Sequence, residues 1–286
     1  MIPWRPLLVF LAIPVGTTTA IARLCAAMGW TVESPAFAVL APVAMWAPAL
    51  GSHVARRTVD RRFTATLPVR EWGRTGARVI LRPLLYPFLV YGACYAIGVS
   101  TGIAHWSPGG GKWTNARQIV ANVVVNLTIL GVIGTLNAMG EEIGWRGYLQ
   151  PRLDAAGVRA SVIVVSLCEV AYHAPVIAFA GYAATGGFWM SLLLFALGSP
   201  AWSFIAAREA YLARSVWPAV FFHSFHNTIS QWLFPKFFAV SHGQPWLAGE
   251  SGVLPNVGYV VLGAALYVSM RRRGQSWRAL ARCSLG

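Results

Sequence analysis

The stretch ANVVVNLTILGVIGTLNAMGEEIGWRGYL, residues 121–149, decides the fold. Its first 20 residues carry no charge, and about 20 mainly apolar residues suffice for a helix to cross the hydrocarbon core of a bilayer. The stretch then ends in three ionisable residues, Glu141, Glu142 and Arg146. Charged groups inside a membrane are costly, so this combination predicts a membrane helix that carries a functional site.

The composition of the whole chain agrees with a membrane protein. Of 286 residues, 56% are hydrophobic and 11% are charged, against roughly 25% charged in ordinary soluble domains. A soluble domain of this size would need more polar surface than the chain can supply. We therefore predict an all-α, polytopic transmembrane bundle of about eight helices, forming a single integral-membrane domain over residues 1–286. The expected segments are Leu7–Cys25, Pro35–Val54, Val79–Ile103, Ala121–Leu149, Ala160–Phe179, Phe188–Ala207, Val216–Phe234 and Leu254–Met270.

The basic residues predict how this bundle is oriented. The chain has 23 Lys and Arg against 9 Asp and Glu, a net charge of +14. In a soluble protein this excess would suggest nucleic acid. Here most basic residues lie in short loops between apolar segments, so we expect the lipid bilayer and no nucleic acid as a partner. By the positive-inside rule both termini are cytoplasmic, and Arg208 and Arg214 belong to a cytoplasmic loop. The expected location is a bacterial plasma membrane, crossed several times.

Three expected segments carry nearly all of the ionisable residues that fall inside the membrane. If the fourth helix extends to Leu149, with Pro151 as its stop signal, the three groups lie about 14 to 21 Å from the nearest cytoplasmic helix ends. They can then converge in the cytoplasmic half of the membrane. The residues are Glu141, Glu142 and Arg146; Glu169 and His173; and His223, His226 and Asn227.

The spacing of these residues favours the activation of water. Glu142 and Arg146 are four positions apart on one helix face, which favours an ion pair. Glu141 lies about 100° around the helix and can face another partner. His223 and Asn227 also share a face. A carboxylate can act as general base, while imidazole and carboxamide groups can stabilise an oxyanion.

Three motifs resemble those of a known family. Glu141-Glu-Ile-Gly-Trp-Arg146 resembles the EExxxR motif of the type II CAAX prenyl endopeptidases and their bacterial relatives, the CAAX protease and bacteriocin-processing (Abi) family. His173-Ala-Pro resembles the second motif of that family, and His223-Ser-Phe-His-Asn227 resembles its HxxxN motif. The resemblance implies an eight-helix, glutamate-dependent intramembrane endopeptidase with a catalytic core at about residues 121–234.

The resemblance also implies roles for the single residues. Glu141 would activate water together with His173, while His223 and Asn227 would bind the oxyanion or the water. Glu142 and Arg146 would have a supporting, mainly structural role. If a metal such as zinc takes part, His173 and His223 are its candidate ligands.

Glu169 departs from the family pattern, since it stands where the second motif has Phe. It lies one helical turn before His173. Its carboxylate could orient His173, favour the protonated imidazole, or point elsewhere.

Two other functions remain open at this stage. Glu141, Glu169 and His173 could form the relay of a proton-coupled transporter, although no internal repeat supports that reading. The chain could also be a non-catalytic, Abi-type immunity protein. Other protease classes lack their motifs: there is no HExxH and no GxSxG, and Asp60 and Asp154 both fall in expected loops. The expected substrate is a peptide or a membrane protein, and the sequence does not indicate an oligomeric state.

Overall fold

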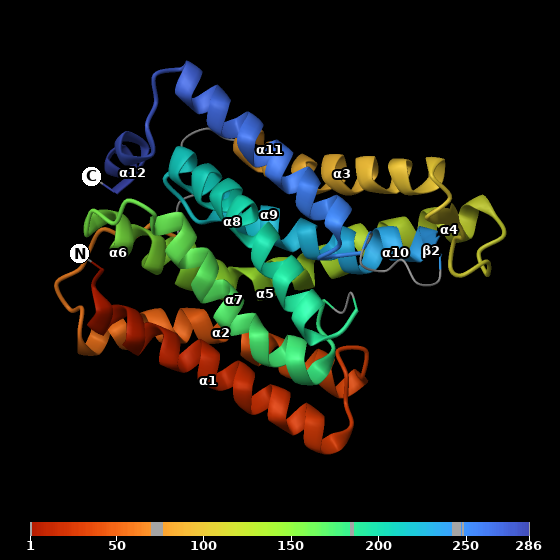
Figure 1. Ribbon diagram of the computed structural model, residues 1–286, viewed down its shortest axis with the longest axis horizontal. Coiled ribbons are helices and arrows are strands. Elements are labelled where there is room, and N and C mark those ends of the chain that lie inside the picture. The colour runs from red at the N-terminus through yellow and green to blue at the C-terminus, as the bar shows by residue number, and fades with distance from the viewer. Residues whose placement is uncertain (1, 70–76, 184–185, 242–246, 248, 286) are drawn as a thin grey trace.

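The computed structural model describes residues 2–69, 77–183, 186–241, 247 and 249–285. It is an all-α bundle of long helices with one small antiparallel pair of strands (Figure 1). The first half of the chain forms α1 (Trp4–Met28), α2 (Pro35–Thr58), α3 (Ala77–Ser100), β1 (Ala104–Trp106), α4 (Ala116–Val125), the π-helix η1 (Asn126–Leu130), α5 (Gly131–Gly144), the π-helix η2 (Trp145–Leu149) and α6 (Gln150–Ala155). The second half forms α7 (Ser161–Ala180), α8 (Phe188–Ala213), α9 (Trp217–Asn227), the π-helix η3 (Thr228–Leu233), α10 (Phe234–Phe237), β2 (Phe238–Val240), α11 (Val253–Arg272) and α12 (Trp277–Leu285).

The predicted polytopic bundle is confirmed. Within the described residues, seven helical runs are long and apolar enough to cross a membrane, and all seven coincide with expected segments. The remaining expected segment, Val216–Phe234, is also helical, as the run α9–η3–α10. Its site-forming His, Asn, Ser and Gln residues make it more polar than the other seven. Both termini lie at the same end of the bundle (Figure 1), as an even number of crossings requires.

The fourth segment extends past Leu149, as the depth argument required, but Pro151 does not stop it. The helical run continues from Ala116 to Ala155. A proline lacks the N–H that would bond the carbonyl four residues earlier. In this chain that carbonyl, of Gly147, accepts a bond from the Leu67 backbone N–H at 3.2 Å. Because a loop supplies the missing donor, the helix tolerates the proline.

Two glycines let α5 approach α2 closely beside the acidic pair. A Cβ atom at Gly140 would lie 2.6 Å from the Met45 carbonyl oxygen, and one at Gly144 would lie 2.5 Å from the Pro48 side chain. Small residues four apart are a common device for bringing membrane helices together. The pair flanks Glu141 and Glu142 and so fixes the helix that carries them.

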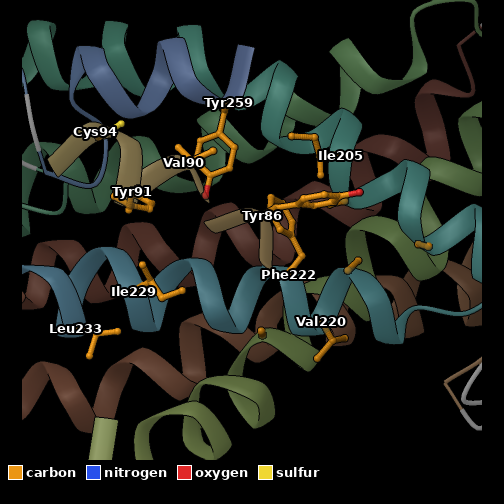
Figure 2. Close-up of a cluster of buried hydrophobic side chains, with 14 of the residues drawn as sticks. Tyr86, Val90, Tyr91, Cys94, Ile205, Val220, Phe222, Ile229, Leu233 and Tyr259 are labelled. Atoms are coloured by element: carbon orange, nitrogen blue, oxygen red, sulfur yellow. The ribbon is translucent and has the colours of Figure 1, made fainter. Parts of the chain in front are cut away.

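The other side of the site rests on an aromatic core between α3, α8, α9 and α11. Figure 2 shows how its side chains interlock, with Phe222 of α9 beside Tyr86 of α3 and below Ile205 of α8. Phe222 is fully buried and precedes His223 directly. Packing of this core therefore sets the rotation of α9 and the direction in which its polar residues project.

Candidate active site

The structure brings the four predicted catalytic residues together. Glu141 of α5, His173 of α7, and His223 and Asn227 of α9 all line a cavity of about 70 Å³. The same four residues line a second cavity of about 120 Å³, on the side of α1 and α2. They therefore stand where two cavities adjoin, and the first cavity alone has room for at least one water molecule.

Glu141 is almost fully buried, with 3% of its surface exposed. Its carboxylate accepts hydrogen bonds from Trp145 Nε1 at 3.3 Å and from the Tyr172 hydroxyl at 3.4 Å. Both bonds are longer than the usual 2.7–3.2 Å. Among the described ion pairs, none includes Glu141. This carboxylate thus lines a cavity and has no strong partner among the described contacts.

Glu142 has a different environment, because it connects two other site residues. Its Oε1 lies 3.1 Å from Arg146 Nη1, so the ion pair expected from the spacing is present. The same oxygen lies 2.9 Å from His223 Nδ1. Sequence reasoning missed this second contact, since it joins residues 81 positions apart. Glu142 is therefore placed to orient an imidazole as well as to neutralise the arginine.

Arg146 is the buried cation of the site. It is 1% exposed, donates to the Ser203 hydroxyl at 3.0 Å, and its guanidinium carbon lies 5.0 Å from the centre of the Trp202 ring. Its Nη1 also lies 2.5 Å from Glu169 Oε1. The sequence left open whether the Glu169 carboxylate acts on His173 or points elsewhere. In the structure it points elsewhere, toward this arginine.

The imidazoles of both predicted catalytic histidines are held through Nδ1. His173 Nδ1 lies 2.8 Å from the backbone carbonyl of Glu169, which can only accept a hydrogen bond. His223 Nδ1 faces the carboxylate of Glu142 in the same way. These partners assign the proton of each neutral ring to Nδ1 and leave Nε2 as an acceptor.

Glu250 also belongs to this site, although sequence reasoning missed it. It precedes α11 and lines the first cavity. Its Oε1 accepts from the Tyr182 hydroxyl at 2.9 Å and from Gln231 Nε2 at 3.0 Å, and His226 Nε2 lies 3.8 Å away. Burial raises the pKa of this carboxyl, but donors from His226, Gln231 and Tyr182 outweigh burial and hold the pKa below its ordinary value. Glu250 is a single acidic residue in an expected loop, and nothing in the nearby sequence indicates that this loop turns into the bundle.

A second buried cluster surrounds Glu209 near the end of α8. Arg208 was expected in a loop but is 5% exposed and lies within the helix, because α8 extends to Ala213. Glu209 is fully buried and binds Arg208, Arg82 and the Tyr86 hydroxyl. None of these residues lines the two cavities at Glu141.

Asp154 also differs from its expected position in a loop. It lies in the short helix α6 and accepts four hydrogen bonds, two to each oxygen. The donors are Gln150, Ser161, Tyr211 and Trp277. Asp154 therefore joins α6, α7, α8 and α12 and takes no part in the cavity.

The donors at the site do not fit a zinc centre in this arrangement. Within the described part of the chain, no group of three His, Cys, Asp or Glu residues is placed to hold a metal ion. His173 and His223 both line the cavities, but a catalytic zinc site needs three protein ligands.

Comparison with known protein families gives a match. Residues 122–229 match the family model of the type II CAAX prenyl endopeptidase Rce1-like proteins. No curated protein sequence matches the chain. The matched range contains all three motifs, from Glu141 to Asn227, and confirms the resemblance drawn from them. It supports CAAX-protease-type activity, that is a peptide hydrolase, in a multi-pass membrane protein. Glu250 lies outside the matched range.

Proposed function

We propose that the protein is an intramembrane endopeptidase that cleaves peptides or membrane proteins with a water activated by Glu141. One observation carries the proposal: Glu141, His173, His223 and Asn227 line both of two adjoining cavities. A peptide running from one cavity to the other would place a bond beside all four side chains.

The reaction begins with a water held between Glu141 and the Nε2 atom of a neutral histidine. Glu141 takes one proton as the water oxygen attacks the peptide carbonyl carbon, and the carbonyl π electrons move onto oxygen. The C–N bond then breaks, and Glu141 returns the proton to the leaving nitrogen. General acid–base help of this kind is typically worth 10²–10⁴-fold in rate.

Asn227 supplies the donor that the oxyanion needs. With Nδ1 protonated and bonded, a neutral imidazole offers only an acceptor at Nε2. The carboxamide of Asn227 carries N–H donors without a charge, and it lies one turn from His223. In this proposal His173 and His223 orient the water, Asn227 binds the oxyanion, and Glu142 and Arg146 fix the His223 ring.

The proposed location is a bacterial plasma membrane, with both termini and the site toward the cytoplasm. The density of arginine in alternate loops supports it. Reporter fusions after Arg62 and Arg278 should give a cytoplasmic signal, and a fusion after Gly110 the opposite signal. A cytoplasmic signal at Gly110 would contradict this orientation.

Proteomics of cells that express wild type or Glu141→Ala tests the function directly. Uncleaved membrane proteins or peptides should accumulate with the variant at equal expression. Purified wild-type protein should then cleave the accumulated species and the variant should not. A proton flux in proteoliposomes that depends on Glu141, without any cleavage, would instead support a transporter. Equal phenotypes for both proteins would support a non-catalytic immunity role.

A further inference from the structure

The first cavity has an unusual charge balance. Glu141, Glu169 and Glu250 line it together with three histidines, and none of the described lining residues is Lys or Arg. Arg146 stands behind the wall, but Glu142 and Glu169 share it. The site and its wall therefore contain four carboxylates, those of Glu141, Glu142, Glu169 and Glu250, and one guanidinium, that of Arg146. In a site of low dielectric such an excess of one sign attracts the opposite charge strongly.

One carboxylate oxygen in this wall has no donor at all. Glu169 is 4% exposed, and its Oε2 atom is buried without a hydrogen-bond partner. Leaving a buried polar atom unsatisfied costs free energy, more so when the group is charged. Glu169 occupies the position where the second motif has an apolar Phe, so this chain itself makes the wall acidic. An N–H donor from a ligand would satisfy the atom.

Glu250 lines the same cavity and has no Lys or Arg partner among the described ion pairs. Tyr182 and Gln231 both donate to Oε1. They fix the carboxylate in place through one of its two oxygens. Tyr182 also stacks on the His173 ring, with centroids 5.4 Å apart, so Glu250 is tied to the catalytic residues.

The second cavity differs from the first in that Glu169 and Glu250 do not line it. Away from the predicted catalytic residues its lining is mainly apolar, with Phe37, Ala41, Ala44 and Met45 of α2 and Val176 of α7, and Thr18 of α1 adds a hydroxyl. The first cavity instead offers Ser251, Asn256 and Tyr259 beside Glu250. The two cavities therefore suit different chemical groups on the two sides of the bond.

We propose that the first cavity binds a cationic group of the peptide substrate, a Lys or Arg side chain or an amino terminus, with Glu250 and Glu169 as its anionic partners. The second cavity takes an apolar side chain across the cleaved bond. This inference rests on the proposed endopeptidase function and gives it a substrate class. Glu250 is its specificity-determining residue.

The test uses the full chain in proteoliposomes and a set of apolar model peptides with Lys, Leu or Asp at each position in turn. Product masses locate the cut, and kcat/KM is measured for each peptide. At one position near the cut, Lys should exceed Asp by about 10- to 100-fold, the range for a hydrogen-bonded charge. Glu250→Gln should remove most of this preference, and Glu250→Lys should reverse it.

Two matched variants separate charge from shape. Glu250→Gln keeps an acceptor for Tyr182 and Gln231, so its effect reports the charge. Tyr182→Phe removes one bond to Glu250 but keeps the charge and the ring, and it should retain the Lys preference. Glu169→Gln, on another helix, should weaken the preference by a smaller factor, and it tests the cavity if the Glu250 variants do not fold.

Binding of the same peptides with an uncharged, uncleavable replacement for the peptide bond keeps this inference separate from catalysis. If wild type hydrolyses nothing, the endopeptidase proposal fails, while tighter binding of Lys than Asp peptides still supports a cation site. Equal binding and cleavage of Lys and Asp peptides by wild type would overturn the inference. So would a preference that Glu250→Lys leaves unchanged.

Discussion

The regions around Glu141 and Glu209 both bury a carboxylate inside the bundle, but they satisfy it differently. Glu209 Oε2 accepts from Arg82 Nη2 at 2.7 Å and Nε at 3.1 Å, while Oε1 accepts from Arg208 and from Tyr86 at 3.3 Å. Glu141 has only two long bonds from neutral donors.

The difference distinguishes a carboxylate held by strong partners from one that is available for the proposed reaction. At Glu209 two guanidinium groups and a hydroxyl meet one carboxylate, so the group holds α3 against α8 and has little capacity left. At Glu141 the strong donor nearby, Arg146, is taken by Glu142 and Glu169, and a cavity lies in front of the carboxylate. Burial of a carboxylate alone is therefore no sign of function. A buried carboxylate that lines a cavity and accepts few strong hydrogen bonds is a better candidate for a functional group.

The largest expected effect comes from Glu141→Gln. The substitution keeps the shape and one acceptor but removes the base, so cleavage should fall by at least about 10²–10⁴-fold. The thermal unfolding temperature in detergent should stay near that of wild type, because only two long bonds are affected. Near wild-type turnover of the variant would show that Glu141 does not act as the general base.

Glu209→Gln should show the opposite pattern. It leaves two guanidinium groups around a neutral amide, and breaking a buried pair of this kind costs about 3 kcal/mol. We expect a lower unfolding midpoint in denaturant titrations, with kcat per folded molecule within a few-fold of wild type. A selective loss of kcat with unchanged stability would place Glu209 in the catalytic machinery and undo the comparison.

Glu142→Gln should combine both effects at a smaller size. The amide oxygen can still accept from His223 Nδ1, but the charge that balances Arg146 is lost. Since Glu169 remains at the same guanidinium, we expect about 1–2 kcal/mol of lost stability and about tenfold slower cleavage. Glu142→Ala, which also removes the acceptor for His223, should be slower still. Equal activity of the two variants would mean that the contact with His223 is without consequence.

The smallest expected effect is that of Glu169→Phe on the pH dependence of cleavage, which should not change. The Glu169 carboxylate faces Arg146, while His173 is held by the Glu169 backbone carbonyl, which a Phe retains. The pH–rate profiles of wild type and variant should therefore have the same shape for an apolar substrate. A profile displaced toward lower pH in Glu169→Phe would show that the carboxylate acts on His173 after all.

Sequence reasoning found the helices and most of the site because both leave local signals. Apolar length predicts a membrane helix, and the Glu142–Arg146 pair follows from helical spacing. The direction of the Glu169 side chain, the bond from Glu142 to His223 and the inward position of Glu250 could not be predicted in the same way. These three features depend on how separate segments are rotated and packed against one another. The spacing of residues along one segment contains no information about that.

By itself the sequence determined that this chain is a polytopic helical membrane protein and that its candidates for chemistry lie on three segments, and the resemblance of three motifs singled out Glu141, His173, His223 and Asn227 among them. The reason is physical: a bilayer forces long apolar segments into helices and makes every polar residue within them costly. Only the tertiary structure decided which carboxylate has strong partners and which faces a cavity. Hydrogen bonds and ion pairs form between side chains from different helices, so close packing alone assigns Arg146 to Glu142 and Glu169 and leaves Glu141 free.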